Sequence, residues 1–209
     1  MAVVCEIRHP LIQHHLAKLR EKGTPPDEFR RLVGRLASLL AFESTRDLEL
    51  QSVEIETPLT RIPAQRLSQR IGLVPILRAG LGMVDPLLEL LPDSEVWHLG
   101  LYRDEETAQP VEYYNKIPAR DPVDVALVLD PMLATGGSSI AALQVLRRWG
   151  VQNLKVLSLI AAPEGIRNLT DSFPNAQVYV CAIDEQLNSR KFIVPGLGDA
   201  GDRSFNTLP

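Results

Sequence analysis

Short apolar runs alternate with helical patterns beyond residue 70, and this alternation constrains the fold more than any other feature. Continuous apolar strands separated by helices are typical of a parallel sheet that is covered on both faces. We therefore predict an α/β fold whose ligands bind beyond the carboxyl ends of the strands. The predicted strands are Leu73–Leu77, Val96–Leu101, Val125–Leu129, Val156–Ala161 and Val178–Ile183.

Helical periodicity is strongest in three places. Pro86–Leu91 and Ser138–Trp149 have helical spacing, and Gly150 stands where a C-terminal cap of the second helix belongs. From Asp27 onward, apolar residues recur at i, i+3, i+4 and i+7, and Asp27 is the expected cap of that helix. Residues of about 1–45 form an N-terminal helical segment in this prediction.

Two stretches depart from the alternation. Residues 102–118 are polar, charged and too long for an ordinary connection, which is typical of a lid or binding loop. Residues 192–205 carry three glycines and two aspartates after the last strand. Because the chain has no internal repeat and no convincing linker, we expect a single domain over residues 1–209.

Composition excludes several classes of protein. The net charge of -4 argues against a non-specific nucleic-acid binder, which usually carries a basic face. No apolar run approaches the ~18 residues of a membrane span, and the first residues carry charges where a signal peptide needs an apolar stretch. The two cysteines are too few for a disulfide framework. We expect a cytoplasmic protein without nucleic-acid or membrane partners.

The junction after Val125–Leu129 carries the most information about chemistry. The strand ends on Asp130, and Thr135-Gly136-Gly137-Ser138 then leads into a helix. Glycines let backbone N–H groups turn toward an anion, and a helix N-terminus adds partial positive charge. The segment predicts a phosphate cradle, although it lacks the spacing and lysine of a nucleotide P-loop. The alternative is an ordinary glycine-rich turn in which Ser138 caps the helix.

Residues 130–138 resemble the ribose-phosphate loop of the type I phosphoribosyltransferases, and in particular that of the uracil phosphoribosyltransferase family. The general pattern has two acidic residues after the strand, whereas the second is Pro131 here, so Asp130 is expected to hold the ribose hydroxyls largely alone. The resemblance extends over nearly the whole chain through Arg8–Leu11, Val74–Met83, Tyr102–Thr107, Ala161–Ile166 and Ile193–Asp202. It implies a mainly parallel central sheet flanked by helices, with a β-arm at about 102–118 and a C-terminal hood at about 192–205.

The resemblance implies that the chain uses phosphoribosyl pyrophosphate (PRPP). Arg78 and Arg103 would hold the pyrophosphate and, with Asp130, are the expected catalytic residues, while a surface ion pair is the alternative for a lone arginine. In the family the bond to pyrophosphate breaks ahead of attack by the base, so positioning and charge stabilisation dominate catalysis. The expected PRPP-binding residues are Arg78, Arg103, Asp130, Pro131, Met132, Leu133, Ala134, Thr135, Gly136, Gly137, Ser138 and Asp199.

The resemblance also implies Mg²⁺ as a cofactor. This ion often sits on substrate phosphates with waters, so we expect no dedicated set of protein ligands. The four histidines lack a cysteine partner and clear ligand spacing, and we predict no metal site among them.

Residues 196–201 match the Gly-x-Gly-x-x-Gly pattern of dinucleotide-binding proteins. That fingerprint opens a helix within a strand–helix–strand unit and is followed by an acid ~20 residues later, for which too little sequence follows here. By resemblance, Ile193, Gly198, Asp199 and Ala200 are expected to bind uracil as part of a hood. The alternative is a floppy glycine-rich tail.

The function that the resemblance implies is the conversion of uracil and PRPP to UMP and pyrophosphate in pyrimidine salvage. Two alternatives stay open: a pyrimidine-sensing RNA-binding regulator on the same fold, and a phosphoribosyltransferase for another base. The net charge argues against the first and the C-terminal motif against the second. The resemblance further implies a homodimer or larger homo-oligomer and, in some members, activation by GTP, for which we can assign no segment.

Overall fold

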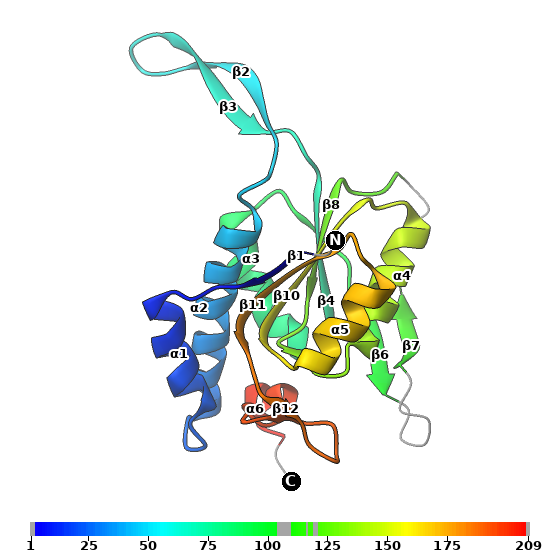
Figure 1. The fold of residues 1–209 in the computed structure, drawn as a ribbon. Coiled ribbons are helices and arrows are strands. Elements are labelled where there is room, and N and C mark those ends of the chain that lie inside the picture. The colour runs from blue at the N-terminus through cyan, green and yellow to red at the C-terminus, as the bar shows by residue number, and fades with distance from the viewer. Residues whose placement is uncertain (1–2, 104–109, 116, 119–120, 208–209) are drawn as a thin grey trace.

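The apolar runs form the centre of one large sheet. A computed structural model describes residues 3–103, 110–115, 117–118 and 121–207. The sheet has the strand order β1–β11–β10–β8–β4–β6–β7 (Figure 1). These strands are β1 (Val3–Glu6), β4 (Ile71–Leu77), β6 (Leu99–Arg103), β7 (Pro110–Asn115), β8 (Val125–Leu129), β10 (Asn153–Ala161) and β11 (Gln177–Ile183).

Neighbouring strands along this order run parallel, apart from the antiparallel pair β6–β7. Two short strands, β5 (Glu95–Val96) and β9 (Met132–Leu133), add to β4 and β10. The predicted α/β fold is therefore confirmed. Because the parallel strands share a direction, the loops that follow β4, β8, β10 and β11 meet at one edge of the sheet.

Helices cover both faces of the sheet (Figure 1). They are α1 (Pro10–Arg20), α2 (Pro26–Ser44) and α3 (Val84–Leu90) on one face, with α4 (Gly137–Trp149) and α5 (Pro163–Ser172) on the other. Strand β8 shows how the alternation of side chains serves both layers. Leu127 packs in the hydrophobic cluster that contains α2, while the adjacent Val128 packs in the cluster that contains α4.

Two of the predicted boundaries need a correction with a physical reason, and others differ by three residues or fewer, as where β10 begins at Asn153 rather than at Val156. The strand expected at Val96–Leu101 is wrong as a single element, because β5 ends at Val96 and β6 begins only after Trp97 and His98. The cap expected at Asp27 is also wrong, since α2 begins at Pro26 and Pro25 is its N-cap. Proline suits the first helical position because its fixed φ matches the helix. Asp27 lies in the first turn, where its negative charge still favours the helix dipole.

Several elements had no counterpart among the predicted ones, among them β1, α5 and two small sheets. The hairpin β2 (Leu50–Glu56) and β3 (Arg61–Leu67) forms a sheet of its own and projects from the body at the end opposite α6 (Ala200–Phe205) (Figure 1). A second small sheet joins β12 (Gln186–Leu187) to β13 (Ile193–Val194), and α6 follows it in the chain. In the described part of the chain, no helix is long and apolar enough to cross a membrane.

Candidate active site

The loop after β8 has the features of the predicted phosphate cradle. Gly136 adopts a φ of 84° and is the N-cap of α4, a left-handed conformation that favours glycine. The first N–H groups of a helix have no partner within the helix, and in α4 they belong to the residues just after Gly136. Residues 130 and 132–139 line a cavity of about 140 Å³. The cradle thus joins a helix N-terminus to an open volume.

The alternative in which Ser138 caps the helix is wrong. The cap position belongs to Gly136, and Ser138 is already the second residue of α4. The next residue, Ser139, is 1% exposed, lines the same cavity, and has a hydroxyl without a hydrogen-bond partner among the described residues. Ser139 was not among the predicted site residues. The repeated serine at 138–139 was the only available signal, and the sequence does not say which hydroxyl faces inward.

Helix α5 supports the cradle from outside. A Cβ added to Gly165 would lie 2.3 Å from the carbonyl oxygen of Ala134, so only glycine permits this close approach. The side-chain amide of Asn168 donates a hydrogen bond of 3.0 Å to the carbonyl oxygen of Thr135. The shape of the cradle therefore depends on α5 as well as on its own glycines.

Asp130 is the acid of this loop. Its side chain is partly buried at the end of β8, and Oδ1 accepts a 3.2 Å hydrogen bond from the backbone N–H of Met132. Burial raises the pKa of Asp130 to about 6, an effect that this hydrogen bond only partly opposes. Pro131 supplies no second carboxylate. Asp130 is thus a carboxylate at neutral pH but close enough to titration to respond to a nearby cation.

The loop after β4 lies against the same strand end. A Cβ added to Gly80 would lie 2.3 Å from the carbonyl oxygen of Leu129, which places this loop beside Asp130. A cis peptide joins Leu77 to Arg78. The Arg78 guanidinium is 56% exposed, and its Nη2 lies 3.1 Å from Oδ1 of Asp202. The ion pair considered as the alternative is therefore present, and its partner belongs to the hood.

Arg103 ends β6 at the same edge, because β6 runs parallel to β4. The backbone of Arg103 pairs with that of Pro110 in the antiparallel partner strand β7. The side chain of Arg103 and residues 104–109 lie outside the described part of the chain. Closure of the arm over a ligand stays a prediction.

The hood is an ordered structure, so the alternative of a floppy tail is wrong. Ile193, Leu197 and Ala200 are 3–4% exposed and belong to a hydrophobic core cluster. The side chain of Asp199 caps α6 by accepting a 2.8 Å hydrogen bond from the N–H of Asp202. Because the Ile193 side chain is buried in the core, any contact of Ile193 with a base would come from its backbone.

The structure brings the predicted residues together at one edge. Asp130 and Arg78 follow adjacent strands, and α6 contacts the turn that begins after Arg78. The dinucleotide alternative finds no support, because α6 has only six residues and no described strand follows it. Among the described residues, no group of three or more His, Cys, Asp or Glu side chains is placed to hold a metal ion.

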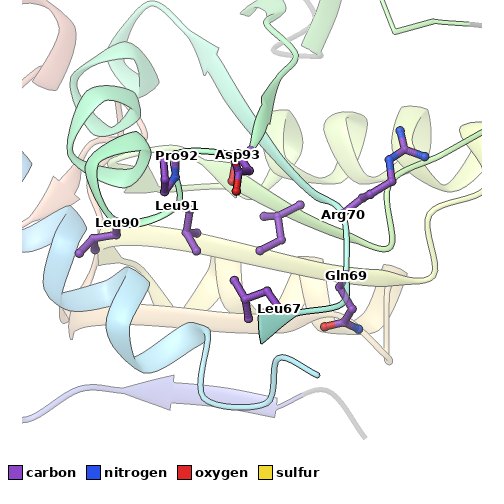
Figure 2. Close-up of a pocket in the computed structure, with 9 residues that line it drawn as sticks. Leu67, Gln69, Arg70, Leu90, Leu91, Pro92 and Asp93 are labelled. Carbon is purple, nitrogen blue, oxygen red and sulfur yellow. The ribbon is translucent and has the colours of Figure 1, made fainter. Parts of the chain in front are cut away.

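A second cavity, of about 190 Å³, lies at the opposite end of the sheet, at the foot of the hairpin (Figure 2). Leu67 of β3 and Leu90 of α3 line it, together with Arg70, which is paired with Glu95. Strand β4 begins here at Ile71, so the whole length of the strand separates this cavity from Arg78. No predicted site residue lines it.

A sequence model of the uracil phosphoribosyltransferase family matches residues 6–207. The chain belongs to this family. Uracil phosphoribosyltransferases from Roseiflexus castenholzii and Roseiflexus sp. (strain RS-1) are 56% and 55% identical to it. These matches cover 96% and 99% of the chain and 96% and 100% of the two relatives. The family resemblance of the motifs is therefore confirmed.

Solved structures agree with this membership. A protein from Aquifex aeolicus is 35% identical, with a TM-score of 0.93 over 97% of this chain and 98% of that one. A hypoxanthine-guanine phosphoribosyltransferase from Bacillus anthracis matches with a TM-score of 0.50 at 12% identity, over 76% of this chain and 80% of that one. The second likeness concerns the fold alone, which is that of the type I phosphoribosyltransferases.

Proposed function

We propose that this chain is a pentosyltransferase that converts uracil and PRPP to UMP and pyrophosphate in pyrimidine salvage. The observation that carries the proposal is the meeting of the phosphate cradle, Asp130 and Arg78 with the hood at one edge of the sheet. The proposal is supported by relatives of 55–56% identity over nearly the whole chain, which bear the name uracil phosphoribosyltransferase.

In this proposal the cradle binds the 5-phosphate of PRPP. The N-terminus of α4 offers unpaired N–H groups and the positive end of the helix dipole, both of which favour an anion. The hydroxyls of Thr135 and Ser138 add donors, and the buried hydroxyl of Ser139 is a further candidate. Met132, Leu133 and Ala134 line the same cavity, and Pro131 precedes them in the loop.

Asp130 holds the ribose hydroxyls, and Arg78 and Arg103 hold the pyrophosphate. As the bond to pyrophosphate breaks, positive charge develops on the ribose and negative charge on the leaving group. A carboxylate on one side and guanidinium groups on the other stabilise both charges. No protein nucleophile is needed. Arg78 must exchange its contact with Asp202 for the pyrophosphate, and its exposed position permits that exchange.

Mg²⁺ is the cofactor in this proposal. The carboxylate of Asp130, which lines the cradle cavity, fits an ion that is bound mainly by oxygens of the substrate. Mg²⁺ keeps waters and phosphate oxygens as ligands, and when bound it neutralises charge on the departing pyrophosphate.

Uracil binds at the hood, against Ile193 and the segment Gly198–Ala200. Since the side chain of Ile193 is buried, recognition rests on backbone donors and acceptors whose order is fixed by the chain. Asp199 belongs to both the proposed uracil site and the proposed PRPP site. It is the N-cap of α6 and accepts a hydrogen bond from Asp202, whose side chain contacts Arg78.

A purified-protein assay with PRPP, Mg²⁺ and a panel of bases tests the proposal. We expect UMP and pyrophosphate in equal amounts with uracil, and little product with purines. Product with another base but not with uracil would contradict the choice of substrate. Absence of any nucleotide product, together with salt-dependent binding of RNA, would favour the regulator instead.

We further propose that the chain acts as a homodimer or larger homo-oligomer in the cytoplasm. The projecting hairpin supports this proposal, because a two-stranded hairpin alone is at best marginally stable in water. Leu50, Leu59 and Leu67 on the hairpin are 43–95% exposed, and Leu90 at its foot is 51% exposed. Such a group of exposed leucines is typical of an interaction surface.

Light scattering after size exclusion tests the assembly. We expect Leu67→Asp and Leu90→Asp to dissociate the native species, and Leu11→Asp, at an exposed position of α1, to leave it intact. A native chain that is monomeric at micromolar concentration would contradict the proposal. GTP stays a candidate effector without an assigned site, which GTP titration into the UMP assay tests.

A further inference from the structure

The turn at Gly196, in the middle of the hood, is held from both sides by one ion pair. Nη1 of Arg20, at the end of α1, donates to Oδ2 of Asp184 at 2.8 Å and to the carbonyl oxygen of Gly196 at 2.7 Å. Oδ2 of Asp184 also accepts from the N–H of Gly196 at 2.9 Å. We call these two side chains the Arg20–Asp184 clamp.

The clamp is buried and bidentate. The second guanidinium nitrogen of Arg20 contacts Oδ1 of Asp184, and the two side chains are only 22% and 4% exposed. The planar fork of arginine matches a carboxylate in one orientation, so the pair fixes direction as well as distance. A buried ion pair is a weak source of net stability compared with apolar packing, although removal of one partner alone destabilises the fold by leaving the other charge buried. Its geometry, rather than its contribution to folding, is what distinguishes this pair.

The clamped turn connects the parts of the hood that are proposed to contact the base. Gly196 has a φ of 64°, and a Cβ there would lie 2.1 Å from the carbonyl oxygen of Ile193. The turn thus sets the direction of the chain from Ile193 to Gly198. Any rotation of the Gly196 peptide groups moves the backbone donors and acceptors on both sides of it.

A second arginine repeats the attachment. From α6, Nη1 of Arg203 donates to the carbonyl oxygens of Leu19 and Leu197, each at 2.8 Å, and Nη2 donates to that of Glu21 at 2.6 Å. Three consecutive residues at the end of α1, namely Leu19, Arg20 and Glu21, therefore hydrogen-bond to the hood. Unlike the clamp, Arg203 bonds to the residue after Gly196 rather than to Gly196 itself.

We propose that the Arg20–Asp184 clamp is a positioning device that presents the backbone of the hood in the conformation that binds uracil. The inference rests on the proposed function and names residues that do not touch either substrate. Without the clamp, the Gly196 turn samples other conformations, and the apparent affinity for the base falls by the fraction of molecules that remain competent. Binding of PRPP at the cradle, on other loops, is left unchanged.

Steady-state kinetics of Arg20→Gln, Arg20→Lys and Asp184→Asn test the clamp. For Arg20→Gln we expect the KM for uracil to rise about 10-fold, as when about one molecule in ten is competent, while kcat and the KM for PRPP change less than 3-fold. Arg20→Lys keeps the charge but not the fork, so we expect an intermediate KM. Arg46→Gln, which removes an exposed ion pair with Glu43, is the matched control.

A merely structural role predicts a different pattern. Loss of folded protein lowers the active fraction and hence the apparent kcat, without a selective rise in the KM for uracil. Equal effects on both substrates, or an unchanged KM for uracil in Arg20→Gln, would overturn the inference while the native chain still made UMP. If Arg20→Gln did not fold, Arg20→Lys and Asp184→Asn would decide by the same criterion. A native chain that made no UMP would overturn the proposed function as well.

Discussion

The phosphate cradle (residues 130–138) and the hood (residues 192–205) belong to one proposed site but are stabilised by different means. The cradle is attached directly to β8 and α4 and is shaped by backbone approach, as at Gly165 and Ala134. The hood depends on contacts with the end of α1, far away in the sequence: the Arg20 side chain, and the carbonyl oxygens of Leu19 and Glu21 that accept hydrogen bonds from Arg203. An anion can be bound by main-chain groups that local sequence dictates. The orientation of a base-binding segment requires contacts that only the complete fold supplies.

The hood provides the largest expected effect, discrimination between uracil and cytosine. Uracil offers an acceptor, a donor and an acceptor along its O2–N3–O4 edge, and neutral cytosine reverses the last two. Cytosine would leave at least two buried polar groups unpaired, at ~1–3 kcal/mol each. We expect kcat/KM to favour uracil by ~10²- to 10⁴-fold, measured by nucleotide formation with each base.

Ile193→Ala sharpens this test. The side chain is 4% exposed in the core, so truncation should destabilise the fold by about 2–5 kcal/mol and weaken uracil use without making cytosine a good substrate. Ile193→Val serves as the milder comparison. Comparable use of both bases by the native chain would contradict readout by the backbone.

The cradle provides the next effect, through Asp130→Asn. We expect kcat to fall by ~10²-fold, since one preorganised charge at the ribose is lost. The folded state holds the Asp130 proton up to a pKa of about 6, whereas an unfolded chain releases it near 3.8. Stability from this group therefore declines as pH rises from about 4 to 6 and stays low above that range.

It follows that Asp130→Asn should raise the free energy of unfolding at pH 7.5 by about 1–3 kcal/mol. The variant should therefore melt at a higher temperature than the native chain. The native kcat/KM for PRPP should fall below pH about 6, as the carboxylate becomes protonated. Thermal melts and a pH profile measure both. Near-native turnover in the variant would remove Asp130 from the catalytic residues.

The difference between the two regions also explains what could be predicted from sequence. The strand at Val125–Leu129, the acid after it and the helix ending at Trp149 follow from apolar runs and glycines within one short segment, and the structure reproduces them. The clamp could not be predicted, because nothing near Arg20 indicates that its partner is Asp184. Strand β1 was missed because it is four residues long and partly exposed, and β2–β3 because neither strand enters the core.

Gly165→Ala tests the backbone packing that shapes the cradle. The new methyl group would lie 2.3 Å from the carbonyl oxygen of Ala134, so the loop must move. Because displacements of about 1 Å can cost ~10²-fold, we expect the KM for PRPP to rise by ~10- to 10²-fold. Gly23→Ala is the control, since a Cβ there meets no atom within 4 Å. Unchanged PRPP kinetics would show that the cradle tolerates the shift.

The smallest expected effect is that of Arg103→Ala. If this arginine reaches pyrophosphate only when the arm closes, its removal should weaken the binding of PRPP and hardly change the stability of the free protein. Loss of a charged hydrogen bond, ~1.5–3 kcal/mol, corresponds to about a 10-fold or larger rise in the KM for PRPP. The melting temperature should change by less than about 2 °C. A destabilised chain with native kinetics would instead indicate a surface ion pair.

The distance of 164 residues between Arg20 and Asp184 also sets the order in which the molecule can be completed during synthesis. Chains are made from the N-terminus, and domains begin to fold as they emerge. The cradle and its support from α5 are complete once Asn168 has been added. At that stage Arg20 of α1 still lacks its carboxylate partner, because Asp184 has not yet been added. A growing chain therefore contains every residue of the cradle before it contains the carboxylate that completes the clamp, and β11, which lies between β1 and β10 in the sheet, is likewise added only after α5.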